Sequence, residues 1–244
     1  MISSLPIYLS VGSAMLITAP LSVLVSRPVT GIQWQYVMAA FAVFCVSCFF
    51  LILPFAFPVL KIGHLNWSGK IFSIVVTYAI ILSRRRHDPA RKFVTLSQKE
   101  GAGRRSAVII LLLLLFSALN SVLGGSEGRP PINWETLLFE ATLPGIDEEA
   151  VYRAAFLGYI LAAVRVKGAP SWRGTAGSVF TCAVLFGLLH ALHFDPALHM
   201  HFDATAFAFT GIVGAGLAIL TLNSGSILLP VIAHNLTNCI GILL

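Results

Sequence analysis

Long apolar runs constrain this chain more than any other feature. They are roughly 16 to 25 residues long, and a helix of about 20 apolar residues crosses a hydrocarbon core of about 30 Å. Only 11% of the 244 residues are charged, whereas about 25% is usual in a soluble domain. Lipid offers the backbone no hydrogen-bond partners, so runs of this kind must be helical. The sequence therefore predicts an all-α fold, a polytopic membrane helical bundle.

The apolar runs predict about eight transmembrane helices. Their expected ranges are 5–25, 36–60, 67–82, 107–123, 148–166, 178–192, 204–222 and 226–244. The segment 133–143 is too short and too acidic to span, and the Gly/Pro-rich stretch GGSEGRPP precedes it. Pro144 and Gly145 are expected to break the chain just before the fifth span. The first residues carry no basic stretch, so we expect the first run to stay in the membrane.

The basic residues predict an orientation. Residues 84–105, after the third span, hold eight of the 16 Lys and Arg, so this loop should be cytoplasmic. If each span crosses once, Arg27 and the basic segment 165–173 fall on the same side, and both termini lie outside. The loop with Lys61 and Lys70 then also lies outside, against the rule. The net charge of +6 comes from basic residues that lie beside apolar runs, which indicates contact with a membrane surface and not with nucleic acid.

Three groups of polar residues interrupt the apolar runs of the second half. They are Glu148, Glu149 and Arg153, then His190, then His234 with Asn238. In the predicted topology all three groups lie in the outer half of the membrane, at similar depth. Ionisable groups at membrane depth cost free energy, and they usually face the protein interior and carry function. We therefore expect these residues to form one site.

The residue types fit a hydrolytic site. Glu149 and Arg153 have the spacing of an ion pair on one helix, which leaves Glu148 to point elsewhere. A desolvated Glu beside a His can activate water. His234 and Asn238 lie one helical turn apart, so both can donate to the oxyanion of a tetrahedral intermediate.

Two other interpretations use the same residues. The polar groups can satisfy one another and hold helices together, as Asn and His do in membranes. Alternatively, zinc can bind to nitrogen and oxygen ligands of this kind, which here are Glu148, Glu149, His190 and His234.

The three motifs EExxxR, FxxxH and HxxxN, in this order, resemble those of the CAAX protease and bacteriocin-processing (CPBP, or Abi) family. The matching residues are 148–153, 186–190 and 234–238. The resemblance implies a glutamate-type intramembrane endopeptidase that uses no metal or other cofactor. It implies that Glu148 and His190 activate water and that His234 and Asn238 stabilise the oxyanion. It gives supporting roles to Glu149, Arg153, Phe186 and Tyr152, although plain core packing is an equal alternative for Phe186.

We therefore predict an endopeptidase that cuts a membrane-associated peptide or protein tail. We expect a single integral membrane domain over 1–244, with spans lacking any motif in 1–132 and the motif-bearing core in 133–244. The bacterial inner (cytoplasmic) membrane is the expected location, with the active site towards the outer side. The alternatives are a zinc-dependent protease with the same residues, a non-enzymatic immunity or scaffolding protein, and a transporter that relays protons through intramembrane Glu and His.

Two further groups of residues need an interpretation. Cys45 and Cys48 have CxxC spacing inside an apolar run, where we expect buried small side chains and not a metal or redox site. The segment HALHFDPALHMHFD is rich in histidine and aspartate, and we expect a solvated outer loop there, with a second metal site as the alternative. Its residues are His190, His193, Asp195, His199, His201 and Asp203.

Overall fold

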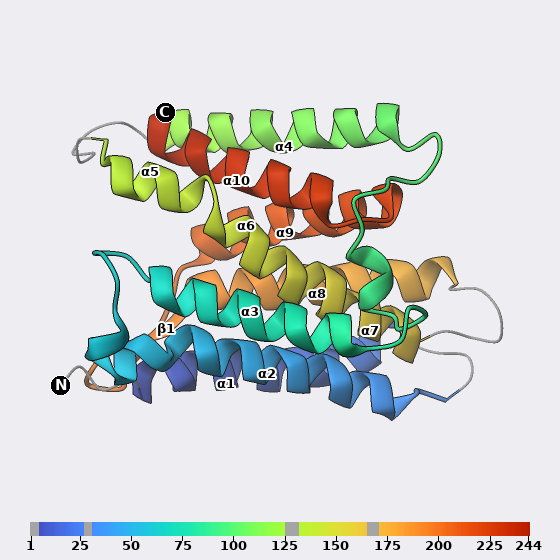
Figure 1. The fold of residues 1–244 in the computed structure, drawn as a ribbon, viewed down its shortest axis with the longest axis horizontal. Helices are drawn as coiled ribbons and strands as arrows, with labels where there is room; N and C mark the ends of the chain where they lie inside the picture. The colour runs from blue at the N-terminus through green and yellow to red at the C-terminus, as the bar shows by residue number, and fades with distance from the viewer. Residues whose placement is uncertain (1–4, 27–30, 125–131, 165–170) are drawn as a thin grey trace.

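The protein is a bundle of long helices, as a computed structural model shows for residues 5–26, 31–124, 132–164 and 171–244 (Figure 1). This confirms the predicted all-α membrane fold. Most of the Gly/Pro-rich stretch GGSEGRPP lies outside the described residues, as do Arg27, Arg165 and Lys167.

The N-terminal half contributes four helices and two short 3-10 turns. They are α1 (Leu5–Ser26), α2 (Trp34–Ala56), η1 (Pro58–Leu60), α3 (Trp67–Ser83), η2 (Arg91–Phe93) and α4 (Gly103–Leu123). The C-terminal half begins with the short helix α5 and continues into a segment whose middle part is a π-helix. Its elements are α5 (Trp134–Glu140), α6 (Leu143–Glu148), the π-helix η3 (Glu149–Phe156), α7 (Leu157–Ala163), α8 (Trp172–Ala191), β1 (Leu192–Phe194), β2 (Met200–Phe202), α9 (Ala204–Ser224) and α10 (Leu228–Leu243).

Five of the described helices are long and apolar enough to cross a membrane. They are α1, α2, α4, α8 and α9, while α3 and α10 are shorter apolar helices. The remaining predicted span corresponds to the continuous run α6–η3–α7. Each predicted span thus coincides with helix in the described chain, but the number that cross the bilayer stays a prediction.

Helix α4 shows how the bundle meets lipid. Leu111, Leu115 and Leu119 repeat every four residues along one side of this helix, and each is more than half exposed. The opposite side carries Leu113 and Ser117, which are buried. A large exposed apolar face is rare on a monomeric soluble protein. In a bilayer the same face needs no further partner, so the exposed leucines support an integral membrane protein.

The run α6–η3–α7 is the centre of the fold. It passes through the middle of the bundle in Figure 1, and every residue of η3 and α7 is buried. Helices α2, α3 and α8 all contact η3. Aromatic rings fill this contact: Phe44 packs edge-on against Tyr152 at 5.6 Å between ring centroids and lies 6.3 Å from Phe156. The first two residues of the EExxxR motif therefore lie where the described helices converge.

The expected chain break at Pro144 and Gly145 is wrong. Both residues lie inside the first turn of α6, and the break falls at Thr142, between α5 and α6. Proline is tolerated at the first helical position because its missing N–H would have no partner there. Asn235 of α10 bridges the break: its side-chain oxygen accepts from the Gly145 N–H at 2.8 Å, and its amide donates to the Thr142 carbonyl at 3.1 Å.

Two smaller expectations also need correction. Helix α8 begins at Trp172, six residues before the expected 178, because Ser171 caps it by accepting from the Gly174 N–H at 3.0 Å. Arg173 is therefore in the first turn of a helix and not in a loop. Cys45, expected to be buried, is exposed, whereas Cys48 is half-buried, and both are free thiols.

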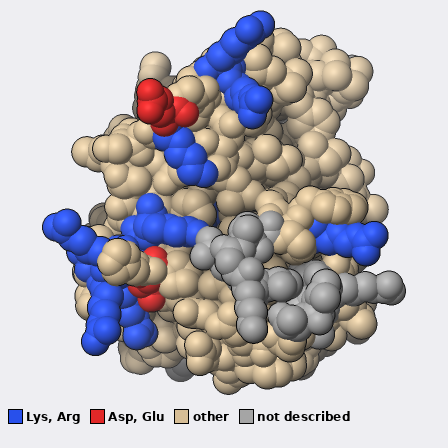
Figure 2. All heavy atoms as spheres, turned by 90° about the vertical axis from the view of Figure 1, so that its right-hand side faces the viewer, with Lys and Arg blue, Asp and Glu red and all other residues tan. Residues whose placement is uncertain are grey.

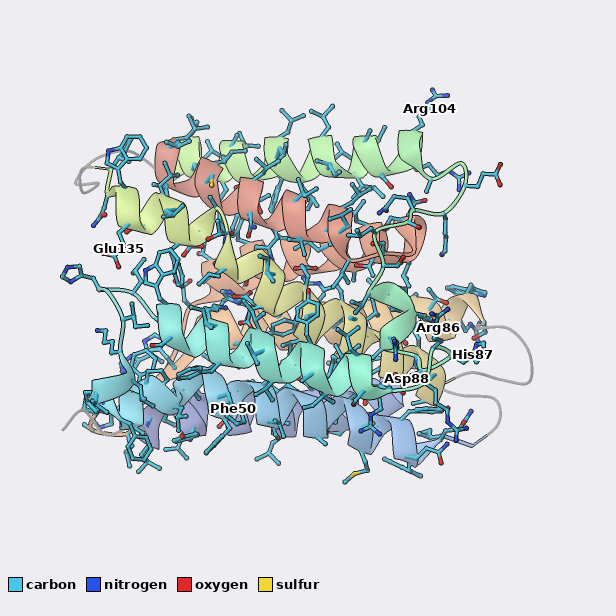
Figure 3. All side chains as sticks on the ribbon, viewed as in Figure 1. Phe50, Arg86, His87, Asp88, Arg104 and Glu135 are labelled. Atoms are coloured by element: carbon cyan, nitrogen blue, oxygen red, sulfur yellow. The ribbon has the colours of Figure 1, made fainter. Side chains whose placement is uncertain are left out.

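The two ends of the bundle differ in charge. Arg86, His87 and Arg104 lie at one end, and Glu135 lies at the other (Figure 3). Figure 2 shows the first end face-on, with many more Lys and Arg than Asp and Glu on it. Helix α1 begins, and α10 ends, at the end opposite to this basic face (Figure 1).

We expect Gly145→Ala to destabilise the protein. An added Cβ would lie 2.5 Å from the Asn235 side-chain oxygen and 2.7 Å from the Val231 carbonyl oxygen, so α6 must move away from α10. Overpacking of this kind costs about 1–3 kcal/mol. Thermal unfolding of the detergent-purified protein measures the effect. Gly12→Ala is the control, because a Cβ there meets nothing within 4 Å. Equal unfolding temperatures for the two variants would contradict the expectation.

Candidate active site

A cavity of about 650 Å³ opens between helices of both halves of the chain. Helices α3, α4, α5, α6, α8, α9 and α10 contribute to its wall. Five residues predicted from the sequence line it: Glu148, Phe186, His190, His234 and Asn238. Glu149 and Arg153 lie behind this wall, and Tyr152 lines a smaller cavity of about 230 Å³. The structure thus brings residues from four elements to one place.

The two glutamates point in different directions, as adjacent helical residues must. Glu149 is completely buried, and its Oε1 lies 3.1 Å from a guanidinium nitrogen of Arg153. The same oxygen accepts a hydrogen bond from Nδ1 of His234 at 2.7 Å. Glu148 instead reaches the cavity. Glu149 therefore ties η3 to α10, and the carboxylate of Glu148 remains available to the cavity.

Arg153 has no solvent exposure, and its guanidinium contacts Glu149, an aromatic ring and a backbone carbonyl. Its guanidinium lies over the ring of Phe186 at 4.5 Å and donates to the Gly214 carbonyl at 3.3 Å. An aromatic face attracts a desolvated cation more strongly than an exposed one. Gly214 permits this approach, because a Cβ there would lie 3.0 Å from the Phe186 ring. Arg153 thereby joins η3 to α8 and α9.

Both histidines direct Nε2 to the cavity side, because Nδ1 of each ring is engaged elsewhere. Nδ1 of His190 donates to the Phe186 carbonyl at 2.8 Å, because a carbonyl oxygen can only accept. Its Nε2 is therefore free for the cavity, and the ring packs on Phe186 at 4.4 Å between centroids. Nδ1 of His234 donates to Glu149, so its Nε2 is the nitrogen on the side of Glu148, 3.8 Å from Oε2.

Asn238 has a partner that the sequence did not indicate. Its side-chain amide donates to Glu140 Oε2 at 2.7 Å, and both residues line the cavity. Glu140 is the last residue of α5, the helix too short to span. An acidic residue at the end of a short helix carries no signal that would link it to a residue 98 positions later.

Lys70 is the second residue that sequence reasoning missed. It was expected in a loop, but it lies in α3, is buried, and lines the cavity. Its Nζ lies 2.7 Å from Glu148 Oε1 and 2.9 Å from Asp147 Oδ2. The available signal was a lysine three residues inside an apolar helix, because such a charge normally faces a partner in the protein interior.

The histidine-rich segment is a β-hairpin and not an irregular loop. Strands β1 and β2 pair antiparallel with His193 opposite His201, and these rings stack at 5.2 Å. Asp195 accepts from ring nitrogens of His201 at 3.1 Å and His199 at 3.3 Å. Hydrogen bonds from His201 and from the His199 backbone lower the pKa of Asp195 to about 2. Asp203 caps α9. The hairpin is largely exposed, and the described residues contain no group of three His, Cys, Asp or Glu arranged for a metal ion.

Comparison with known proteins gives one family. Residues 130–240 match a family model described as Type II CAAX prenyl endopeptidase Rce1-like. This range includes all three motifs, and it excludes Lys70. No curated protein and no solved structure matches the chain.

We expect Glu149→Gln to destabilise the protein strongly. The change leaves the Arg153 guanidinium buried without its counter-charge, and breaking a buried pair in this way costs about 3–5 kcal/mol. The shift in unfolding temperature of the purified protein measures it. Glu100→Gln, in an exposed turn, should leave the unfolding temperature unchanged. A Glu149→Gln protein as stable as this control would show that Arg153 does not need the carboxylate.

Proposed function

From the match of residues 130–240 to the type II CAAX prenyl endopeptidase (Rce1-like) family model, we propose that the protein is a glutamate-type intramembrane endopeptidase. It hydrolyses a peptide bond in a membrane-associated peptide or protein tail. One observation carries the mechanism. Glu148 Oε1 is held by Lys70, while Oε2 is buried and makes no hydrogen bond to any described residue, and the Glu148 side chain lines the cavity with His190 and His234.

Glu148 is the proposed general base. Its Oε2 and Nε2 of His234 are 3.8 Å apart, which is too long for a direct hydrogen bond, so Oε2 has no donor among the described residues and can accept from a water that enters the cavity. A water there gives its proton to Glu148 as its oxygen attacks the carbonyl carbon of the scissile peptide bond. His190 lines the same cavity, and Nε2 of its neutral ring is unprotonated, so it can take this proton from Glu148 and pass it to the leaving amine.

His234 and Asn238 are the proposed donors to the oxyanion. Nδ1–H of His234 is engaged by Glu149, so donation from Nε2 requires the doubly protonated ring. Glu148 and Glu149 flank this ring and balance its charge. One N–H of the Asn238 amide binds Glu140, and the other can face the developing negative charge.

The supporting residues hold these groups in place. Glu149 orients His234, Arg153 neutralises Glu149, and Phe186 packs between Arg153 and the ring of His190. Tyr152 packs edge-on against Phe186 at 5.0 Å. Fixed geometry matters because small displacements of reacting groups reduce rates steeply.

The position of the cavity favours a substrate at the outer face of the membrane. The cavity is lined by the last turns of α4 and α10 and by α5, which lie away from the basic end (Figure 1). By the positive-inside rule the basic end is cytoplasmic. We therefore favour a secreted peptide, a leader or a C-terminal sorting tail as substrate over a cytoplasmic prenylated tail. Cysteine labelling of the α5 end from the cytoplasm alone would overturn this orientation.

We expect purified protein to cut a membrane-anchored candidate tail and Glu148→Gln to lose at least about 10³-fold in kcat, because no carboxylate is left to take the proton from water. Cleavage should survive a strong chelator. Mass spectrometry of the products measures both. Glu100→Gln is the control for a distant carboxylate.

Two outcomes would contradict this function. Activity that is lost to the chelator and restored by zinc would support the zinc-dependent protease. A Glu148→Gln protein that folds and keeps the full biological activity would favour a scaffolding or immunity role for the same residues.

A further inference from the structure

We propose that Lys70 is a positioning residue that keeps Glu148 ionised and, by binding Oε1, leaves Oε2 as the oxygen that accepts the proton from water. This inference rests on the proposed role of Glu148 as general base and adds a residue from the N-terminal half, outside the matched range 130–240.

Lys70 makes two short contacts in a dry setting. It is only 8% exposed, and its Nζ lies 2.7 Å from Glu148 Oε1 and 2.9 Å from Asp147 Oδ2. A buried ammonium needs paired charges, and charge-assisted hydrogen bonds of this length are the strong ones. Because the contact occupies Oε1, only the second oxygen of Glu148 remains for chemistry.

Hydroxyl groups fix the other partner of Lys70. Ser73 donates to Asp147 Oδ1 at 2.5 Å, and Ser47 and Ser73 share a hydrogen bond of 2.6 Å. Thr77 donates to Ser47 at 3.1 Å. This chain of hydroxyl groups runs between α2 and α3 and ends on Oδ1 of Asp147, while Lys70 occupies Oδ2. Asp147 is therefore a fixed anchor that holds the lysine against Glu148.

The charge balance distinguishes this role from simple neutralisation. One ammonium faces two carboxylates, so Asp147 alone would already satisfy Lys70. Without Lys70, Glu148 would be a desolvated carboxylate with no hydrogen-bonded cation, and such groups take up a proton instead of staying charged. A protonated Glu148 cannot accept a proton from water. Lys70 and Glu148 also line both the 650 Å³ and the 230 Å³ cavities, so the pair lies in the wall between them.

The first experiment needs no substrate. Dicyclohexylcarbodiimide attaches to protonated carboxyl groups in apolar surroundings, and mass spectrometry locates the adduct. In Lys70→Met we expect the adduct at Glu148 to rise at least about tenfold over wild type. Lys61→Met removes an exposed lysine and should leave it unchanged. An unchanged adduct yield in folded Lys70→Met would overturn the proposal.

The second experiment separates positioning from neutralisation. Against a tail that wild type cuts, Lys70→Met should lose about 10²-fold in kcat, with KM within about threefold. The double variant Lys70→Met with Asp147→Asn removes one positive and one negative charge, so the site has the same net charge as in the wild type. We expect it to stay slow and to keep the Glu148 adduct. Recovery of kcat and loss of the adduct would show that Lys70 merely neutralises Asp147, and would overturn the proposal.

Chemical rescue tests the charge directly. Lys70→Ala removes three side-chain carbons and the ammonium, and propylammonium carries the same atoms. Since Lys70 lines two cavities, we expect propylammonium to raise kcat of this variant at least about tenfold and propanol not to. Equal rescue by both additives would contradict a role for the charge.

Failure of the protease function gives a different pattern. If wild type cuts no tail while the adduct at Glu148 follows Lys70 as expected, the control of Glu148 by Lys70 stands and the protease function fails. If wild type cuts, Glu148→Gln does not, and Lys70→Met matches wild type in kcat and adduct yield, the protease function stands and the Lys70 proposal fails.

Discussion

The rest of the structure depends on neutralising Arg153, a guanidinium without solvent exposure in the middle of a membrane protein. Its counter-charge is Glu149, and its remaining contacts are the ring of Phe186 and the carbonyl of Gly214. The contacts with Phe186 and Gly214 join η3 to α8 and α9, and Glu149 in turn binds His234 of α10. Because an unpaired buried charge is far more costly than a paired one, these helices cannot separate without a large loss of free energy. The ion pair of Glu149 and Arg153 therefore holds the residues of the site in place.

The fold could be read largely from the sequence, because the length of an apolar run in lipid leaves helix as the only choice. The errors lie at helix ends. Pro144 and Gly145 resemble a break, yet α10 approaches so closely that a glycine is required and Asn235 supplies the hydrogen bonds of the true break. Such a contact joins residues 90 and more positions apart, and local patterns do not report it.

The candidate site could be predicted only in part. The pair Glu149 and Arg153 is local, so its spacing was visible. Lys70 and Glu140 reach the site across 78 and 98 positions, and neither belongs to a motif. The tautomers of His190 and His234 depend on which neighbour accepts from Nδ1, which follows only from packing. The functional roles themselves stay predictions, as does the division into 1–132 and 133–244.

The contact between Lys70 and Glu148 has a consequence for how such a protein can be recombined. The outward side of the first four helices is an apolar surface that many sequences could form. The inward side of these helices is not interchangeable in this way. A chimera with foreign N-terminal helices joined to this C-terminal half would still insert into a bilayer. It would, however, bury Asp147 and Glu148 without a counter-charge unless its third helix carries a basic residue at the position of Lys70.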